Sequence, residues 1–216
     1  MFRRVWRPRR TGIYIGASFF TIPGVCSMLD HVLDLFRGAD PTSDWRQRVT
    51  LPLVLDLRTG AVNGIRPNAP YKELAVLGRP ANPRPVARKS FVYPEMGIVY
   101  LVSGERVMGV DVVFQARDVF GELDVAASYE GFAPARLRMV DADGSETYVT
   151  TDSTPDQVRA RFGQAAEIDQ DAEWLGLLYE RGAWELEFEF DARRVLSRVT
   201  ITYKEDRSGG TGDPAG

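Results

Sequence analysis

The residues best placed to do chemistry are carboxylates that alternate with large apolar side chains near the C-terminal end of the chain. Glu185, Glu187, Glu189 and Asp191 alternate with Trp184, Leu186, Phe188 and Phe190. Because a β-strand turns successive side chains to opposite faces, this spacing puts the carboxylates on one face and the apolar groups on the other. Such a row can bind a basic partner or a cation, but exposed acids on a flat sheet lack the burial that raises the pKa of a catalytic acid. The alternative is a solvated face whose charges are offset by Arg198 and Lys204.

Two loops of opposite charge precede predicted strands. Asp169, Asp171 and Glu173 form an acidic loop, which we interpret as mobile rather than as a metal site, and ANPRPVARK is its basic counterpart in the first half. If both loops lie on the same side of the domain, they form a bipolar binding surface. The predicted partner-binding residues are therefore Arg84, Arg88, Lys89, Asp169, Asp171, Glu173, Glu185, Glu187 and Glu189.

Single copies of cysteine and histidine remove much catalytic chemistry. Cys26 alone can form neither an intrachain disulfide nor a cysteine-based zinc site, and a Ser-His-Asp triad or a histidine-rich metal centre would depend on His31 alone. The segment Asp141 to Gly144 resembles the start of a calcium loop, but its glycine comes at the fourth place instead of the sixth. We therefore predict no enzyme, no catalytic residue, no cofactor and no metal.

The charge distribution argues against nucleic acid as a partner. The chain has 27 basic and 30 acidic residues, and six of the basic residues but only two of the acidic ones lie in residues 1–37. Residues 38–216 therefore carry a formal charge of −7. Because phosphate contacts require a basic surface, the acidic body is unsuited to broad nucleic-acid binding.

The N-terminal segment has the pattern of a membrane anchor. Five arginines in the first ten residues precede nineteen uncharged residues, from Thr11 to Leu29. That length in helical form spans a hydrocarbon core of about 30 Å, and the arginines favour the cytoplasmic side. We therefore predict that the membrane is contacted through residues 11–29 and that the domain is extracytoplasmic, with a cytoplasmic location as the alternative.

Other interpretations of this segment stay open. A cleaved export signal is one, although no small-x-small cleavage site follows the apolar stretch. A lipoprotein signal would need a small residue immediately before Cys26, where Val25 stands instead. A soluble N-terminal helix or a wrongly assigned start codon is the remaining alternative. Residues 28–37 have the spacing of an amphipathic helix that ends at Gly38.

The body of the chain contains a pattern that occurs twice. Each copy has a polar cap, a proline and a glycine stop around a predicted two-turn helix, YKELAVLG in the first and QVRARFG in the second. Each predicted helix is followed by three strands joined by turns. Because such a short helix is not stable alone, it must pack on a sheet.

These patterns predict an α+β fold made of two tandem helix-plus-antiparallel-meander units that form mainly antiparallel sheet, preceded by an N-terminal apolar helix. The predicted organisation is residues 1–37 for the basic segment and N-terminal helices, 38–50 for a linker, 51–205 for the two-repeat domain and 206–216 for a flexible tail. The two units cover about residues 51–115 and 133–204.

Three short phrases carry a resemblance to known families. They are Leu77-Gly78-Arg79-Pro80, Tyr93-Pro94-Glu95-Met96-Gly97-Ile98 and Tyr129-Glu130-Gly131-Phe132. With the repeated layout, they resemble the superfamily of the small outer-membrane assembly lipoprotein and the β-lactamase inhibitor protein, and related uncharacterised bacterial domains, some of them suspected immunity proteins. The resemblance spans roughly residues 63–202. It implies binding of other proteins without catalytic residues, but Val25 before Cys26 departs from the lipoprotein pattern.

The sequence therefore favours a non-enzymatic, membrane-tethered domain of the bacterial cell envelope that binds an unknown protein or peptide. The first alternative is an immunity or inhibitor protein that blocks one specific enzyme or toxin. A hydrolase that uses carboxylates alone is the second alternative, and the sequence disfavours it because it shows no phosphate-cradling glycine loop.

Overall fold

Strict alternation of apolar and acidic residues produces the central strand of the second half of the chain. The computed structural model describes residues 40–82 and 89–204. In strand β10 (Trp184–Asp191), every second side chain is buried, and Leu186, Phe188 and Phe190 have no exposed area. The carboxylates between them are partly exposed. This strand therefore has one face in the core and one face toward solvent.

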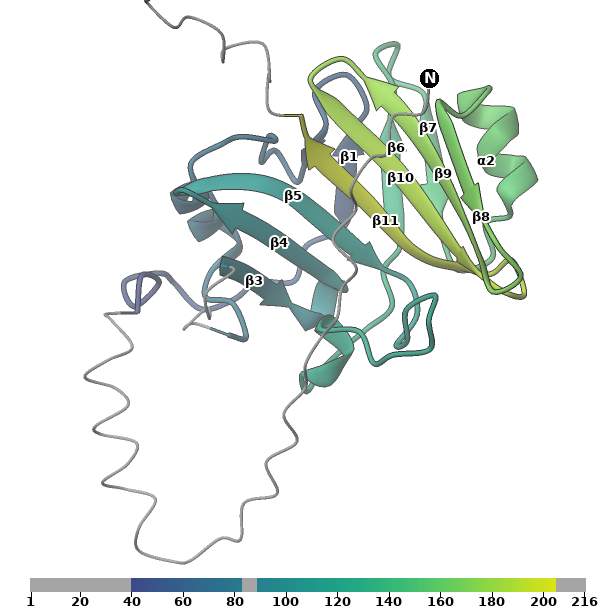
Figure 1. The fold of residues 1–216 in the computed structure, drawn as a ribbon. Coiled ribbons are helices and arrows are strands. Elements are labelled where there is room, and N and C mark those ends of the chain that lie inside the picture. Colours follow the sequence, from purple (N-terminus) through teal and green to yellow (C-terminus); the bar gives the residue numbers. More distant parts are fainter. Residues whose placement is uncertain (1–39, 83–88, 205–216) are drawn as a thin grey trace, which may run out of the picture. The chain divides into compact units, whose positions relative to one another are not determined.

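A seven-stranded sheet forms the larger layer, in the order β3-β4-β5-β11-β10-β9-β8 (Figure 1). All its neighbouring strands pair antiparallel. The central junction is between β5 and β11, where Val112 lies opposite Val199. The strands other than β10 are β3 (Lys89–Tyr93), β4 (Ile98–Ser103), β5 (Arg106–Val113), β8 (Glu167–Gln170), β9 (Trp174–Arg181) and β11 (Leu196–Tyr203).

A four-stranded sheet forms the second layer, in the order β2-β1-β6-β7. Its strands are β1 (Leu53–Asp56), β2 (Ala61–Val62), β6 (Leu137–Val140) and β7 (Glu146–Val149). β1 and β6 pair in parallel, with Leu55 opposite Met139, and this is the one parallel pairing among the described strands. Strands β1 and β6, whose paired residues Leu55 and Met139 are 84 positions apart in the sequence (139 − 55), thus share a sheet.

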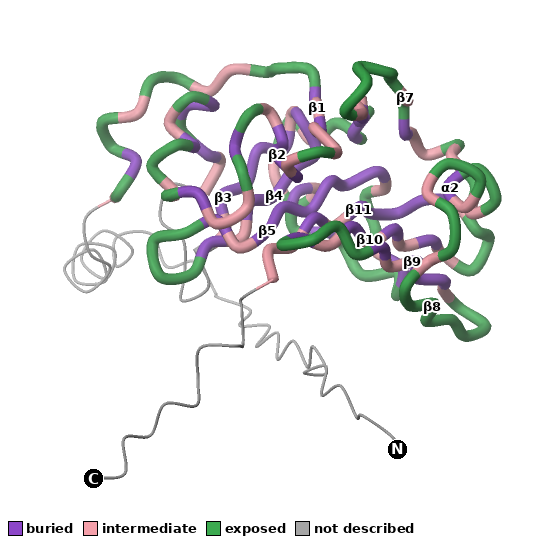
Figure 2. Tube along the Cα trace, turned by 90° about the horizontal axis from the view of Figure 1, so that it is seen from above, coloured by how far each residue is buried: buried purple, intermediate pink, exposed green. Residues whose placement is uncertain are grey.

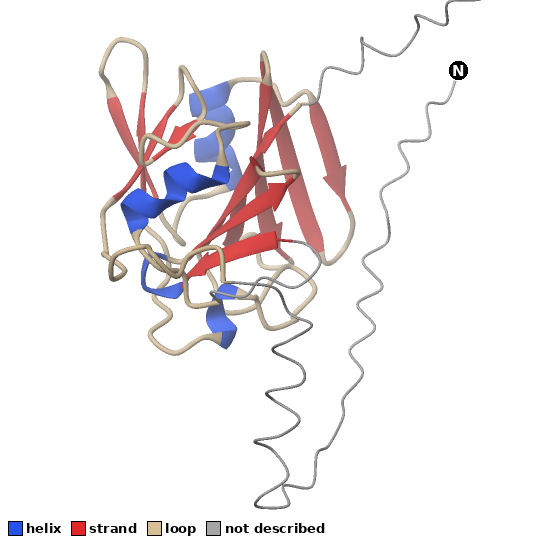
Figure 3. Ribbon diagram, turned by 90° about the vertical axis from the view of Figure 1, so that its left-hand side faces the viewer, coloured by secondary structure: helices blue, strands red, loops and turns tan. Residues whose placement is uncertain are grey.

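The two sheets enclose a single main core. Leu55 and Met139 of the small sheet belong to the same buried cluster as Tyr100, Phe188 and Val199 of the large one. Figure 3 shows the two sheets as separate layers, and Figure 2 shows that buried positions concentrate along their strands. Burial between the layers is the main stabilising contribution, since each sheet leaves an apolar face that must be covered.

Helical structure is limited to short segments. The second predicted helix forms as α2 (Pro155–Phe162), where Thr154 and Gln157 make a reciprocal capping box. The first is a 3-10 helix, η1 (Tyr71–Leu77), whose N-terminal neighbour Pro70 provides no side-chain cap. Two single turns complete the helical structure of the described residues: η2 (Pro94–Met96) and η3 (Ala126–Ser128).

The predicted α+β class is therefore wrong, because the described chain is mainly antiparallel β, with eleven strands in two sheets. The strands of the two predicted units are shared between the two sheets. The β1–β2 and β6–β7 hairpins share the small sheet, and β3–β5 and β8–β11 share the large one. Open strand edges explain this outcome, because pairing β5 with β11 satisfies backbone groups that two isolated meanders would leave exposed.

The outer face of the large sheet, on the side away from the main core, has two different halves. Over β3, β4 and β5 it is apolar, and Val92, Val99 and Val113 form a second buried cluster with Ala126. Tyr129 and Phe132 of the same connecting segment pack against that cluster. The segment after β5 therefore covers this half, and it extends over the outward side of β11 at Arg198, leaving the outer face of β8, β9 and β10 more exposed.

The predicted N-terminal helices and anchor lie outside the described residues, as do the predicted tail and the basic residues Arg84 and Arg88. Within residues 40–82 and 89–204, no helix has the length and apolar composition needed to cross a membrane.

Candidate partner-binding surface

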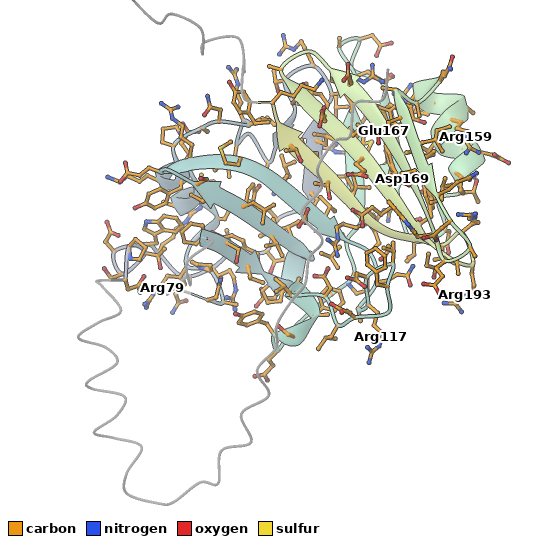
Figure 4. All side chains as sticks on the ribbon, viewed as in Figure 1. Arg79, Arg117, Arg159, Glu167, Asp169 and Arg193 are labelled. Atoms are coloured by element: carbon orange, nitrogen blue, oxygen red, sulfur yellow. The ribbon has the colours of Figure 1, made fainter. Side chains whose placement is uncertain are left out.

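Strand register brings carboxylates of β8, β9 and β10 together on the outer face of the large sheet. Residues directly opposite one another on antiparallel strands project to the same side. Glu187 lies between Thr200 of β11 and Leu178 of β9, and Leu178 lies opposite Glu167 of β8. Figure 4 views this side and labels Glu167 and Asp169. We call the six residues the acidic face: Glu167, Asp169, Glu180, Glu185, Glu187 and Glu189.

One lysine neutralises a corner of the acidic face. The Nζ atom of Lys204 lies 2.9 Å from Glu180 Oε1 and 3.2 Å from Glu185 Oε1. The hydrogen bond to Glu180, with that to Glu185, raises the pKa of Lys204. Since the side chain of Glu180 is 58% exposed, this pair is a surface interaction of modest energy. At another position of the face, Glu189 lies opposite Arg198 of β11 and helps to raise the pKa of that arginine.

A tryptophan lies across the sheet within the acidic face. Trp174 begins β9 on the outward side, and a Cβ built on Gly176 would meet its ring atom Cζ3 at 2.7 Å and Glu187 Oε1 at 3.3 Å. The ring of Phe120 lies 6.1 Å from that of Trp174 between centroids, at an interplanar angle of 53°. Two aromatic rings from segments far apart in sequence therefore meet beside the carboxylates.

Arg198 holds the segment that carries Phe120. Its Nη2 atom donates to Asp124 Oδ2 at 3.0 Å and lies 3.9 Å from Asp118 Oδ2. The hydroxyl of Ser197 donates to the backbone carbonyl of Arg117 at 3.1 Å. Asp124 also accepts from the backbone N–H of Ala126 at 2.9 Å. These contacts dock residues 117–126 against β11 at the border of the acidic face.

Burial shapes the protonation of this charged cluster. Burial raises the pKa of Asp124, and the positive charge of Arg198 only partly opposes the shift. For Arg198, burial disfavours the charged guanidinium, but Asp111, Glu189 and Asp124 outweigh it and raise its pKa. The guanidinium thus stays charged and holds Asp124, while its Nε atom is buried without a hydrogen-bond partner in the described structure.

Exposed apolar side chains follow the same docked segment. Phe120 is 66% exposed, Leu123 is 53% exposed and Val125 is 44% exposed. Three large apolar side chains within six residues, beside a row of carboxylates, make a surface that water solvates poorly. Such a combination is typical of a site for another macromolecule.

The structure separates the residues that the sequence grouped together. Asp169, Glu185, Glu187 and Glu189 share the acidic face, whereas Asp171 forms a turn by accepting from the N–H groups of Glu173 and Trp174 at 2.7 and 3.0 Å. Lys89 begins β3, at the opposite edge of the sheet from β8. β3 and β8 also run in the same direction, so Lys89 and the Asp171 turn lie at opposite ends. The rest of the basic loop, residues 83–88, lies outside the described residues, so the bipolar surface stays a prediction.

Sequence reasoning missed several residues of this surface: Phe120, Glu167, Trp174, Glu180 and Arg198 as a buried anchor. Glu167 and Glu180 become neighbours of the β10 carboxylates only through strand register. The spacing Trp174-x-Gly176 was a signal that could have been used, because a glycine two residues away in a strand leaves room for a large ring.

The chemistry available on this surface is recognition of positive charge. Within the described residues, no group of three or more His, Cys, Asp or Glu side chains is arranged to hold a metal ion. Hydrogen-bond acceptors and two π faces remain, and both attract ammonium and guanidinium groups.

Comparisons with known proteins give one distant likeness. No protein-family model matches the chain, and no curated protein matches it. The crystal structure of a DUF4309 family protein (YjgB) from Bacillus subtilis subsp. subtilis str. 168 is similar over 68% of this chain and 88% of that one. The sequence identity is 14% and the TM-score is 0.43. Similarity at that level implies neither a shared family nor a shared function, and the superfamily resemblance stays a prediction.

Proposed function

We propose that this chain is a non-enzymatic, membrane-tethered binding domain of the bacterial cell envelope, and that its partner is a protein or peptide with basic residues that contact the acidic face. The observation that carries the proposal is the register of β8 to β10, which gathers carboxylates from three strands on the face that also carries Trp174. Trp174 is half-buried and lies at one end of this face against Phe120, whose ring is exposed, and a solvated face needs no such aromatic pair. A binding surface uses one.

The negative charge of the acidic face acts on a partner before the two surfaces touch. Carboxylates clustered on one face attract a basic partner over roughly the 10 Å at which 0.1 M salt screens charges. Attraction of this kind raises the association rate and selects against acidic partners more than it adds affinity. The proposal therefore requires binding that weakens as salt rises.

The aromatic pair supplies the short-range contribution. Trp174 and Phe120 come from β9 and the docked segment, and aromatic residues dominate the affinity of many protein interfaces. A guanidinium placed over the Trp174 ring and between carboxylates would gain both cation–π and ionic interactions. A partner arginine suits this site best, because its planar group stacks and also binds carboxylates with two hydrogen bonds.

The non-enzymatic part of the proposal is supported by where the carboxylates lie. Side chains of Glu180 and Glu185 are 58% and 28% exposed and share Lys204, on an open face of the sheet. A general acid or base is normally set in a cleft with a buried neighbour that adjusts its pKa. The arrangement is better suited to holding a charged partner.

Affinity capture from envelope extracts tests the binding surface. The full chain carries Glu167→Lys and Asp169→Lys in one variant, and the matched control carries Glu73→Lys and Glu105→Lys, which are exposed acids of η1 and the β4–β5 turn. Both variants change net charge equally. We expect the first to lose its partner and the control to keep it. Equal retention by both variants would contradict the proposal.

Cell fractionation tests the tether. The full chain is expected in the membrane fraction, and a chain without residues 1–37 is expected to leave it. Full-length protein found only in the cytosol would refute the envelope location. The identity of the captured partner would also separate an envelope ligand from an enzyme or toxin.

A further inference from the structure

The two edges of the large sheet differ in whether their backbone is covered. At β3, the N–H of Ala81 donates to the carbonyl of Val92 at 2.8 Å. The side chain of Asn82 bonds both Ser90 and Val92, at 2.7 and 2.8 Å. At the opposite edge, all four residues of β8 are exposed (Figure 2). Of the described residues, only those of β9 hydrogen-bond to β8. Its outward N–H and C=O groups are thus open to a partner.

The side chains of β8 have a pattern that selects the incoming strand. Glu167 and Asp169 project over the acidic face, opposite Leu178 and Gly176. Ile168 projects to the other side, opposite Leu177, and is 50% exposed. A strand that pairs with β8 thus meets carboxylates on one face and an exposed isoleucine on the other.

The charges of β8 also exclude a second copy of this chain. Natural sheets protect exposed edges with short strands and charged residues. Antiparallel pairing of two β8 strands would bring Glu167 and Asp169 of each copy close to those of the other, and like charges across strands are destabilising. The same charges favour an incoming strand that carries basic residues. The edge of β8 is therefore protected against a second copy of this chain but open to a basic strand.

We propose that the partner adds an extended segment to β8 as an eighth strand. Its arginine or lysine side chains lie over Glu167 and Asp169, and the apolar residues between them lie beside Ile168. The inference rests on the proposed function and adds to it the conformation and the sequence pattern of the partner: alternating basic and apolar residues. Main-chain hydrogen bonds supply affinity in this binding mode, and alternate side chains supply specificity.

Synthetic peptides separate strand addition from simple charge attraction. The parent is a nine-residue peptide of alternating arginine and valine, titrated calorimetrically into the full chain. Two further peptides carry N-methyl groups on alternate backbone amides, one in each phase, which leaves every charge in place. In an added strand only alternate amides face β8. We expect one N-methylated peptide to lose about tenfold or more in affinity and the other to bind like the parent.

Amide exchange provides a second measurement. Outward-facing amides among residues 167–170 are expected to gain protection when the parent peptide binds, but not when the weakened N-methylated peptide is present at the same concentration. Equal binding of both N-methylated peptides, without protection in β8, would overturn strand addition and leave the acidic face as a binding surface. No binding of the parent peptide would instead count against the proposed function and, with it, this inference.

Discussion

The indole of Trp174 covers Gly176, so that a Cβ at position 176 would fall 2.7 Å from the ring atom Cζ3. That separation is shorter than side-chain carbons adopt, and the ring would have to move. A glycine in the interior of a strand has a cost in conformational freedom, and here it provides the space in which the ring lies on the sheet. The position of Trp174 therefore depends on the absence of a side chain two residues away.

Gly176→Ala is expected to lower the free energy of unfolding by roughly 1–3 kcal/mol through overpacking. Denaturant unfolding monitored by far-UV circular dichroism measures the loss. In a Trp174→Ala background the same substitution should cost much less, because the ring that it displaces is gone. This double-mutant cycle isolates the contact between the two positions. An equal cost in both backgrounds would show that Gly176 matters for a reason other than Trp174.

Asp124 gives the protein an unusual dependence on pH. Burial raises its pKa in the folded state above the ordinary value of 3.8. As pH falls from neutral, folded protein therefore takes up the proton before unfolded protein does, and the unfolding free energy rises relative to that of Asp124→Asn. The gain levels off below pH 3.8, where the unfolded state is also protonated. Urea unfolding of both proteins at several pH values measures the difference. If the unfolding free energy of the unsubstituted protein instead falls relative to that of Asp124→Asn as the pH is lowered, the raised pKa of Asp124 is contradicted.

Two glycines in the left-handed region separate backbone strain from steric clash. Gly97 has φ of 62°, and a Cβ there would meet the backbone oxygens of Ala133 and Val113 at 2.7 and 2.9 Å. Gly104 has φ of 52° with nothing within 4 Å. We expect Gly104→Ala to cost about 1 kcal/mol from strain and Gly97→Ala to cost clearly more, roughly 3 kcal/mol. Thermal and denaturant unfolding would show the order, and equal losses would argue against the clash.

Periodicity predicted the local parts of this fold well. The alternation through Trp184, Leu186 and Phe188 corresponds to β10, and the Thr154 cap with Pro155 corresponds to the start of α2. It failed at YKELAVLG, where the spacing of Leu74 and Leu77 predicted a two-turn α-helix. The structure has a 3-10 helix there, without a side-chain cap. Burial of both leucines against the core holds that segment, so tertiary packing and not intrinsic propensity decides its form.

Long-range pairing could not be predicted in this way. Strands β5 and β11 pair with Val112 opposite Val199, but the side-chain pattern of neither strand specifies which strand it pairs with. This pairing joins strands of the two predicted units in one sheet. The acidic face depends on the same kind of information. The β10 carboxylates were predictable from period two, but Glu167 joins them only because β8 pairs with β9 in one register.

The three phrases behind the superfamily resemblance meet in the folded chain. A Cβ at Gly131 would contact Glu95 Cγ at 3.5 Å, and Glu95 Oε1 binds Arg48 Nη2 at 2.6 Å. The hydroxyl of Tyr93 donates to the carbonyl of Gly78 at 3.1 Å, and a Cβ at Gly78 would clash with the backbone oxygen of Gln47. Close backbone approach explains these glycines. Packing near Glu95 therefore accounts for the residues of the three phrases. The function proposed for the acidic face does not depend on them.

The most direct test of that function is a two-dimensional NMR titration of the isotope-labelled full chain with the arginine–valine peptide, at low and at high salt. We predict that the largest shifts fall on the indole N–H of Trp174, on Gly176 and on the amides of β8, and that affinity drops about tenfold or more between 50 and 500 mM salt. A glutamate–valine peptide of the same length should leave these signals unchanged. Shifts confined to the small sheet or α2, or affinity that does not respond to salt, would contradict the claim that the acidic face is the binding surface.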